Sequence, residues 1–317
     1  MDGCIKIKFV ITTYKNIALI YNPFAGRLQR RPERLQEAVA ALQRAGHGVN
    51  LFPTKAPGSA GQQAREAIAG GADLILACGG DGTINEVASG VIGTIVPFAI
   101  LPGGTANVLS METGQGSNMA KTAAGLSLLV PKRISVGRLQ MDGQPDRHFL
   151  MMLGAGLDAK VVAAVRPAVK RKLGKVAYWI AGLMQTGKTL EESYVTTPTG
   201  EHKASFILVS RIRNYGGDLE IARNVTLLDD DFEVVLFEGT NSLRYLPYFA
   251  GVITKQHRRV PGVKILRTAQ LDLKPVQGQQ MLVQADGELM GAVPARIEIV
   301  PAAITLLLPP QYVQRHS

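Results

Sequence analysis

Short apolar runs alternate with helical patterns along the first third of the chain. Residues 17–21 (IALIY) form a continuous apolar run of strand length, and Leu35, Val39 and Leu42 then recur at the spacing of one helix face. Gly46 follows at the place where such a helix would need a C-terminal cap. The pattern predicts a strand, a turn-rich loop and a helix.

The same cycle repeats further along the chain. Strands are expected at 49–52, 73–78 and 96–101, with helices at 59–68 and 84–91 and another helix starting near 107. This alternation is typical of a parallel sheet covered by helices, with its loops gathered at the carboxyl ends of the strands. We therefore predict an N-terminal α/β nucleotide-binding domain over residues 16–132.

The pattern changes in the second half of the chain. Short strand-like runs separated by turn signals occur at 206–209, 231–237, 280–284 and 296–299. They predict a mainly antiparallel, β-sandwich-like domain over 133–302, joined to the α/β domain by a cleft. The last apolar run, 304–308, is expected to bring residues 303–317 back onto the first domain.

Three glycine-containing loops follow three of the strands expected in the sheet. They are Asn22-Pro23-Phe24-Ala25-Gly26-Arg27, Gly79-Gly80-Asp81-Gly82-Thr83 and Pro102-Gly103-Gly104-Thr105. Glycine lets the backbone approach a phosphate closely, and N–H groups at the start of a following helix hold its negative charge. Loops of this kind at one sheet edge predict a nucleotide site. Neither GxxxxGKS/T nor GxGxxG occurs, which disfavours P-loop and Rossmann dinucleotide sites.

These loops, extended by Ile84-Asn85-Glu86-Val87 and Ala106-Asn107, resemble the diacylglycerol kinase catalytic domain. That family includes bacterial diacylglycerol kinases, sphingosine and ceramide kinases and related lipid kinases, whereas GGDGT alone is shared with NAD kinases. Later segments match the family in the expected order: Gly154-Ala155-Gly156-Leu157-Asp158-Ala159, residues 172–178 (KLGKVAY), Asn214-Tyr215-Gly216-Gly217, Asp229-Asp230-Asp231-Phe232 and Asp286-Gly287-Glu288. The resemblance covers residues 17 to 309.

The resemblance implies an ATP-dependent kinase that phosphorylates the hydroxyl of a diacylglycerol-like or sphingoid lipid. It implies ATP contacts at Asn22, Pro23, Phe24, Ala25, Gly26, Thr54, Gly79, Gly80, Gly82, Thr83, Asn85, Glu86, Gly104, Thr105 and Asn107. Asp81 matches an essential carboxylate, and Glu288 matches the general base proposed for bacterial members. A carboxylate can take the proton of the attacking hydroxyl, and the sequence leaves open which of the two does so. Mg²⁺ is expected with ATP, and a structural Mg²⁺ site matches Asp230 with the main-chain oxygens of Leu227 and Phe232.

Three residues depart from the bacterial diacylglycerol kinase pattern. Val108 and Ser135 stand where the family usually has aspartate, and Asp231 stands where its DDG turn has glycine. The first two remove carboxylates from a network thought to support catalysis, and the third puts a side chain where positive φ is expected. The acceptor lipid is therefore open. Two alternatives remain, an NAD kinase-like enzyme with a soluble substrate and a catalytically impaired nucleotide- or lipid-binding module.

Composition and charge bear on partners and location. The 317 residues are 46% hydrophobic and 19% charged, which is a globular composition, and the formal net charge of +10 attracts polyanions. No apolar run approaches the roughly 20 residues of a membrane-spanning helix, so a cytoplasmic location is expected. The two cysteines, Cys4 and Cys78, argue against a disulfide framework or a zinc site. The basic residues lack interleaved aromatic side chains, so we expect no nucleic-acid partner.

Residues 160–190 contain no acidic residue and combine basic with apolar side chains. This composition fits peripheral docking on an anionic membrane, and a helix packed inward by its apolar face fits equally well. The basic run 255–259 adds to the basic surface or to solubility. A lipid substrate at a membrane surface is the expected partner, and a homodimer is left open.

Overall fold

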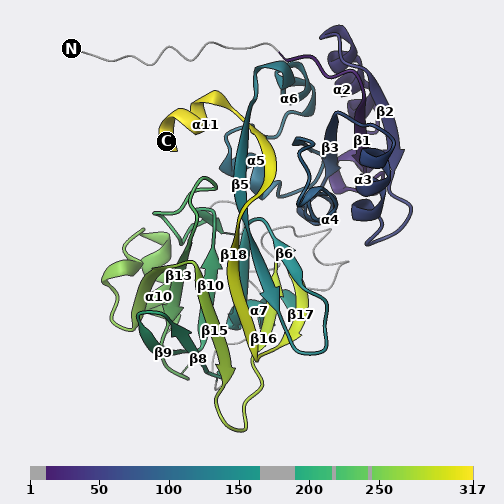
Figure 1. Ribbon diagram of the computed structural model, residues 1–317. Coiled ribbons are helices and arrows are strands. Elements are labelled where there is room, and N and C mark those ends of the chain that lie inside the picture. Colours follow the sequence, from purple (N-terminus) through teal and green to yellow (C-terminus); the bar gives the residue numbers. More distant parts are fainter. Residues whose placement is uncertain (1–11, 165–189, 216–218, 242–244, 317) are drawn as a thin grey trace, which may run out of the picture.

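A computed structural model describes residues 12–164, 190–215, 219–241 and 245–316 of the chain. Figure 1 shows a layered α/β part, with α2, α3 and α4 around β1 and β3, above a part made mainly of strands. The segment 172–178 and most of 160–190 lie outside the described residues, as does Cys4.

The N-terminal part is a parallel sheet with helices on both faces. Its strands β1 (Ile17–Tyr21), β2 (Val49–Pro53), β3 (Leu74–Gly79) and β4 (Phe98–Pro102) lie in the order β2-β1-β3-β4. The helices are α1 (Gly26–Arg30), α2 (Glu33–Arg44), α3 (Ala60–Ala69), α4 (Asp81–Val91), α5 (Val108–Glu112) and α6 (Met119–Ala124).

Strand β3 is buried along its whole length, which explains why its sequence is a continuous apolar run. Alternate residues serve opposite faces: Ile75 and Ala77 belong to the core that includes α3 and α4, whereas Leu74 and Leu76 belong to the core beneath α2 and α6. Cys78 lies in the second of these cores, and burial raises the pKa of its thiol to about 12, so it is a packing residue.

The C-terminal part is an antiparallel β-sandwich. Its elements are β5 (Val130–Gln140), β6 (Arg147–Phe149), β7 (Met152–Gly156), α7 (Leu157–Ala164), β8 (Ser193–Thr197), β9 (Gly200–Ala204), β10 (Phe206–Ser210), β11 (Asn214–Tyr215), β12 (Leu219–Glu220), β13 (Phe232–Phe237), α10 (Tyr245–Ile253), β14 (Val263–Thr268), β15 (Gln270–Pro275), β16 (Leu282–Ala285), β17 (Glu288–Ala292), β18 (Ala295–Leu308) and α11 (Pro310–His316). One sheet has the order β14-β13-β10-β7-β16-β17. Leu153 and Ile207 from this sheet share a core with Leu271 and Ile297 from the facing strands β15 and β18.

Strand β18 joins the two parts into one ten-stranded sheet. Near its start Ile297 pairs with Leu271 of β15, and near its end Leu306 pairs in parallel with Phe98 of β4. Strand β5 runs antiparallel along it, across the boundary expected at residues 132 and 133. The end of the chain therefore lies against the N-terminal sheet.

The expected fold class is confirmed, and local boundaries differ from expectation. Helix α4 begins at Asp81 and not at Ile84, because the glycine loop passes directly into the helix. Strand β5 is 11 residues long and carries no strict apolar alternation, so the sequence pattern does not indicate it. Within the described residues, no helix has the length and apolarity needed to span a membrane.

Candidate active site

The three glycine loops meet at the carboxyl edge of the parallel sheet, as their positions after β1, β3 and β4 predict. A Cβ added at Gly104 would lie 2.4 Å from the Cα of Gly80, so the second and third loops touch through their backbones. A Cβ added at Gly26 would lie 2.7 Å from Oγ1 of Thr105, so the first and third loops also touch. Glycine at these positions is what allows the loops to approach so closely.

Two asparagine side chains hold the loops in shape. Oδ1 of Asn22 accepts a hydrogen bond from the N–H of Phe24 at 2.9 Å, while the ring of Phe24 is 75% exposed. Asn107 is fully buried in the left-handed conformation (φ 51°), and its amide bonds the N–H and the carbonyl of Gly104 at 2.8 and 2.9 Å. The sequence predicts both asparagines at the nucleotide. In the structure their side chains hold the backbone of the first and third glycine loops.

Asp81 connects the second loop to the third. It is the first residue of α4, where a carboxylate is favoured by the helix dipole. Its Oδ1 accepts a hydrogen bond from the N–H of Val108 at 2.7 Å, at the start of α5. The carboxylate thus lies at the N-terminal ends of α4 and α5.

Glu288 reaches the second loop from the other domain. Asp286 and Gly287 both have positive φ (47° and 84°) and form the two-residue turn between β16 and β17, as expected for an Asp-Gly hairpin. Glu288 is the first residue of β17, and its Oε1 lies 3.6 Å from the position that a Cβ on Gly82 would occupy. Its Oε2 accepts a hydrogen bond from Nη2 of Arg147 on β6 at 2.6 Å.

Asp286 is a buried carboxylate next to these groups. Its oxygens accept hydrogen bonds from the N–H groups of Leu150, Met151 and Met152 at 2.7, 3.0 and 2.9 Å. Its pKa is raised to about 6, mainly by burial and in smaller part by the charge of Asp81, against the lowering effect of these bonds.

Asn85 on α4 connects Asp286 to Arg147. With its amide oriented to suit both neighbours, it donates to Oδ2 of Asp286 at 3.1 Å and accepts from Nη2 of Arg147 at 3.2 Å. Hydrogen bonds thus connect the predicted residue Glu288 to Asp286 through Arg147 and Asn85, and the charge of Asp81 acts on Asp286. Nothing in the sequence marks Arg147, whereas the Asp-Gly turn signal and the family resemblance both indicate the segment that holds Asp286.

Two segments singled out by the family resemblance support the hairpin. The carboxylate of Asp158 at the start of α7 contacts the hydroxyl of Tyr215, and it accepts from Nε2 of Gln284 at 2.6 Å. Oε1 of Gln284 in turn accepts from the N–H of Gly287 at 2.7 Å. A Cβ at Gly154 would lie 1.6 Å from Oδ2 of Asp158, so this carboxylate requires glycine beneath it.

Two other residues expected at the nucleotide, Thr54 and Glu86, are bonded to other parts of the N-terminal domain. Thr54 follows β2 and donates its N–H to the carbonyl of Tyr21 at 2.8 Å. The carboxylate of Glu86 accepts from the N–H groups of Gly58 and Ala60 at 3.0 and 3.2 Å, at the start of α3. Glu86 is therefore engaged in holding α3 against α4.

The expected structural Mg²⁺ site contains an arginine. Nη2 of Arg211 donates to the carbonyl oxygens of Leu227 and Asp229, both at 3.0 Å, and Nη1 donates to the carbonyl oxygen of Ser135. Oδ1 of Asp230 accepts from the hydroxyl of Ser135. Two of the expected ligands, the carbonyl oxygen of Leu227 and the carboxylate of Asp230, thus already accept hydrogen bonds from protein groups. A guanidinium lies where a cation would be held, so these residues do not fit a Mg²⁺ ion.

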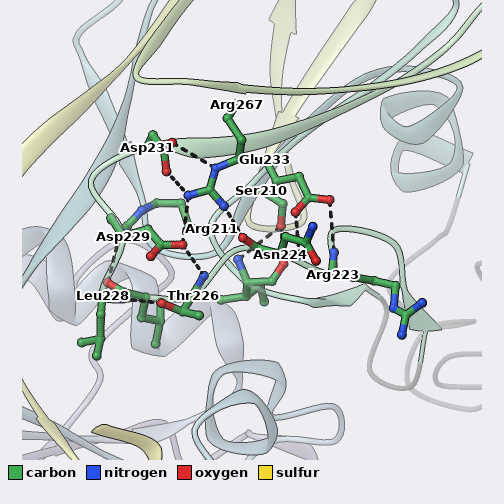
Figure 2. Close-up of polar contacts among 12 residues, drawn as sticks. Ser210, Arg211, Arg223, Asn224, Thr226, Leu228, Asp229, Asp231, Glu233 and Arg267 are labelled. Atoms are coloured by element: carbon green, nitrogen blue, oxygen red, sulfur yellow. Dashed lines mark hydrogen bonds and ion pairs between the residues drawn. The ribbon is translucent and has the colours of Figure 1, made fainter. Parts of the chain in front are cut away.

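The neighbouring carboxylates pair with a second arginine on the outer side of the same turn (Figure 2). Nε of Arg267 donates to Asp231 at 3.0 Å, and its Nη2 donates to Asp229 at 3.0 Å. Asp231, which replaces the glycine of the family pattern, is not among the described residues with positive φ. Phe232 begins β13 and pairs with Thr268 of β14. Among the described residues, no group of three or more His, Cys, Asp or Glu side chains could hold a metal ion.

A cavity adjoins the first loop on the side of α2 and α6. It has a volume of about 420 Å³ and is lined by Arg27, Arg34, Glu37 and residues 117–120. Nη1 of Arg27 donates to the carbonyl of Ser117 at 3.1 Å across one side of it. Two guanidinium groups therefore lie close to the loop expected at the nucleotide.

Two protein families match successive segments of the chain. Residues 16–139 match the diacylglycerol kinase catalytic domain, and residues 151–308 match the YegS C-terminal NAD kinase beta sandwich-like domain. Together the two matches extend over most of the chain.

Individual proteins of known name are similar over nearly the full length. The diacylglycerol kinase of Bacillus subtilis is 26% identical over 93% of this chain and 97% of its own, and the "Probable lipid kinase YegS-like" of Pseudomonas putida is 29% identical over 89% and 92%. Solved structures from Bacillus anthracis share the fold at 24% identity. One covers 98% of this chain and 99% of its own with a TM-score of 0.79, and another, named as a diacylglycerol kinase, has a TM-score of 0.75.

Proposed function

The chain belongs to the diacylglycerol kinase catalytic-domain family and is a lipid kinase of that kind, and we propose that it transfers the γ-phosphate of ATP to the hydroxyl of a diacylglycerol-like or sphingoid lipid. The observation that carries this proposal is the meeting of Glu288 with the loop of Asp81 and Gly82, where the two domains adjoin. One domain supplies the loops for the nucleotide, and the other supplies a carboxylate for the acceptor.

Phosphoryl transfer to an alcohol depends on holding the phosphate, balancing its charge and directing the acceptor oxygen in line. The loops around Gly26, Gly80 and Gly104 leave backbone free of side chains at the sheet edge, where N–H groups can approach phosphate oxygens. Asp81 would act on the Mg²⁺ that accompanies ATP, if it is not itself the base. That ion would balance charge on the transferred group.

The acceptor hydroxyl must lie between the second loop and the hairpin of β16 and β17. Either Asp81 or Glu288 then takes its proton, a contribution worth about 10²–10⁴-fold in rate. Arg147 orients Glu288 through the bond at 2.6 Å, and Asn85 holds Arg147. The pairing keeps the Glu288 carboxylate directed at the loop.

A phase-partition assay tests the proposal. The protein is incubated with γ-labelled ATP, Mg²⁺ and a lipid extract, and the products are divided between chloroform and water. We expect label in chloroform, and none with Asp81→Asn. Label transferred only to a water-soluble acceptor would favour an NAD kinase-like activity, and nucleotide binding without any transfer would favour an impaired binding module.

We also propose that the protein docks on anionic membranes as a cytoplasmic enzyme, and α10 supports this among the described residues. The inner face of α10 packs Tyr245 and Tyr248 against Phe237, with ring centroids 5.8 and 4.7 Å apart. Its outer face carries Leu246 and Ile253, which are 53% and 61% exposed. Figure 1 shows α10 on the outside of the C-terminal domain.

Basic side chains follow the apolar face directly. Lys255, Arg258 and Arg259 come within six residues of Ile253, and Arg223 donates to the carbonyl of Lys255 at 3.3 Å. Lys255 and Arg258 also form ion pairs with Glu220 and Glu233 at 3.0 and 2.5 Å. An exposed apolar helix face beside basic side chains fits an anionic bilayer surface, where a basic residue adds about 1 kcal/mol when no acidic partner offsets its charge. An enzyme whose acceptor is a lipid gains access to it from such a surface.

A further inference from the structure

Arg211 is the largest side chain that is fully buried in the described part of the chain. It follows β10, and its exposed fraction is 0%. A buried guanidinium is costly unless its N–H groups find acceptors. Here its two terminal nitrogens bond three main-chain carbonyl oxygens, those of Ser135, Leu227 and Asp229.

These oxygens are of the kind that hard cations prefer. Carbonyl and carboxylate oxygens are the ligands of Mg²⁺ and Ca²⁺, and Leu227 and Asp230 are two of the three ligands that the family resemblance implies. A divalent ion about 2.1–2.4 Å from the Leu227 oxygen would lie close beside the guanidinium. Two cations in a buried site of low dielectric repel each other strongly, so one cation excludes the other.

The charge of Arg211 is retained at neutral pH. Burial lowers its pKa to about 10, and the nearby carboxylates, Asp230 first among them, act in the opposite direction. Asp230 itself is exposed and bonds the hydroxyl of Ser135. The site thus holds a permanent positive charge inside and a carboxylate at its outer edge.

We propose that the guanidinium of Arg211 replaces a structural divalent cation, so that the turn from Leu227 to Asp230 is held against Ser135 of β5 without bound metal. The protein then takes Mg²⁺ only together with its nucleotide. The inference goes beyond the proposed activity, since it concerns the folded protein alone.

The backbone of the same residue is bonded to the segment that holds Asp286. The N–H of Arg211 donates to the carbonyl of Met151 at 2.8 Å, and the N–H of Met151 donates to Oδ1 of Asp286 at 3.0 Å. Arg211 therefore connects the cation position to the backbone that holds Asp286. The main chain of Arg211 makes this connection, and its guanidinium holds the turn.

The first test measures metal in the full-length wild-type protein without nucleotide. After treatment with EDTA and desalting, the thermal midpoint is compared with and without 5 mM MgCl₂ or CaCl₂, and metal content is measured by mass spectrometry before and after EDTA. We expect no bound divalent ion in stoichiometric amount and no change in the midpoint. A bound ion in the untreated protein, or a midpoint that falls with EDTA and returns with Mg²⁺, would overturn the inference.

The second test compares three substitutions on the same turn. Arg211→Met leaves three buried carbonyl oxygens without donors, and we expect the midpoint to fall by about 5–10 °C. Arg267→Met, the matched control, removes a half-exposed arginine from the outer side of the turn and should lower it far less. Asp230→Asn should also lower the thermal midpoint only slightly, and added Mg²⁺ should not alter the midpoint of this variant.

The outcomes separate the two kinds of site. If Asp230→Asn removed a stabilisation by Mg²⁺ seen in the wild type, a metal site would be present and the inference would fail. If Arg211→Met were no less stable than Arg267→Met, Arg211 would not act as the internal cation. Should Arg211→Met fail to fold, the wild-type metal content decides alone.

Discussion

The carboxylate of Asp81 accepts a hydrogen bond from the backbone N–H of Val108 at 2.7 Å. This bond connects the first residue of α4 to the first residue of α5 and so fixes the second glycine loop against the third. The family pattern has an aspartate side chain at position 108, and here only the main chain of that residue is polar. Asp81 therefore orders the loops, and in the proposed mechanism it also acts on the phosphoryl group.

Asp81→Asn separates these two roles. An asparagine Oδ1 can still accept from Val108, so we expect the thermal midpoint to change little, whereas loss of the negative charge should lower lipid phosphorylation by at least about 10²-fold. Asp81→Ala should lower both the thermal midpoint and lipid phosphorylation. Labelled-product assays and thermal unfolding of the two variants check this, and full turnover by Asp81→Asn would remove its charge from the mechanism.

Glu288→Gln tests the second carboxylate. Because Arg147 donates to Oε2 of Glu288, the glutamine oxygen can keep that bond while the side chain loses its basicity. We expect the turnover number to fall by about 10²–10⁴-fold with little change in the KM for ATP. Arg147→Met, which leaves the carboxylate in place without its orienting partner, should have a smaller effect. Full turnover by Glu288→Gln would show that the basicity of Glu288 is not needed.

Gly104→Ala should disturb the nucleotide site. The new Cβ would lie 2.4 Å from the Cα of Gly80, so the second and third loops would have to move apart. We expect weaker ATP binding and a lower thermal midpoint. Gly80→Ala is the matched control for stability, because a Cβ there meets the Cα of Gly104 at 3.7 Å, an ordinary contact. Calorimetric titration with ATP and thermal unfolding measure both effects.

The buried carboxyl of Asp286 should make stability depend on pH. Its folded pKa is about 6, above the ordinary 3.8, so the folded state binds its proton more tightly than the unfolded state. This contribution is fully present below about pH 3.8 and is lost as the pH rises through 6, a change of roughly 3 kcal/mol. Relative to Asp286→Asn, the wild type should therefore lose free energy of unfolding between pH 4 and 7. If the free energies of unfolding of the wild type and Asp286→Asn changed in parallel with pH, this prediction would be wrong.

Leu246→Glu with Ile253→Glu should weaken membrane docking. Charges on the outer face of α10 cannot enter the bilayer interface, and we expect binding to vesicles of phosphatidylglycerol and phosphatidylcholine to fall by about tenfold or more. Ile95→Glu is the control, since Ile95 is 91% exposed but lies in the loop after α4. Sedimentation with vesicles, at low and high salt, measures the bound fraction. Equal binding by all three proteins would exclude α10 as the docking face.

Much of the N-terminal domain is determined by local sequence. The apolar run at 74–79 and the glycine residues that follow it indicate a buried strand and a phosphate loop, because both depend on residues close together in the chain. The order of loops and later segments also identified the family, which the comparisons confirm. The Asp-Gly pair at 286 and 287 likewise predicts its own hairpin.

Only the tertiary structure decided the contacts between distant segments. Arg147 and Glu288 are 141 residues apart, and the bond between Ser135 and Arg211 spans 76 residues. No local pattern marks an arginine that will be buried, because its side chain is costly there until carbonyl oxygens from β5 and the 227–229 turn are brought to it. The sequence by itself therefore determined the elements and the nucleotide loops, while folding of β5 and β18 into one sheet decided which polar groups meet.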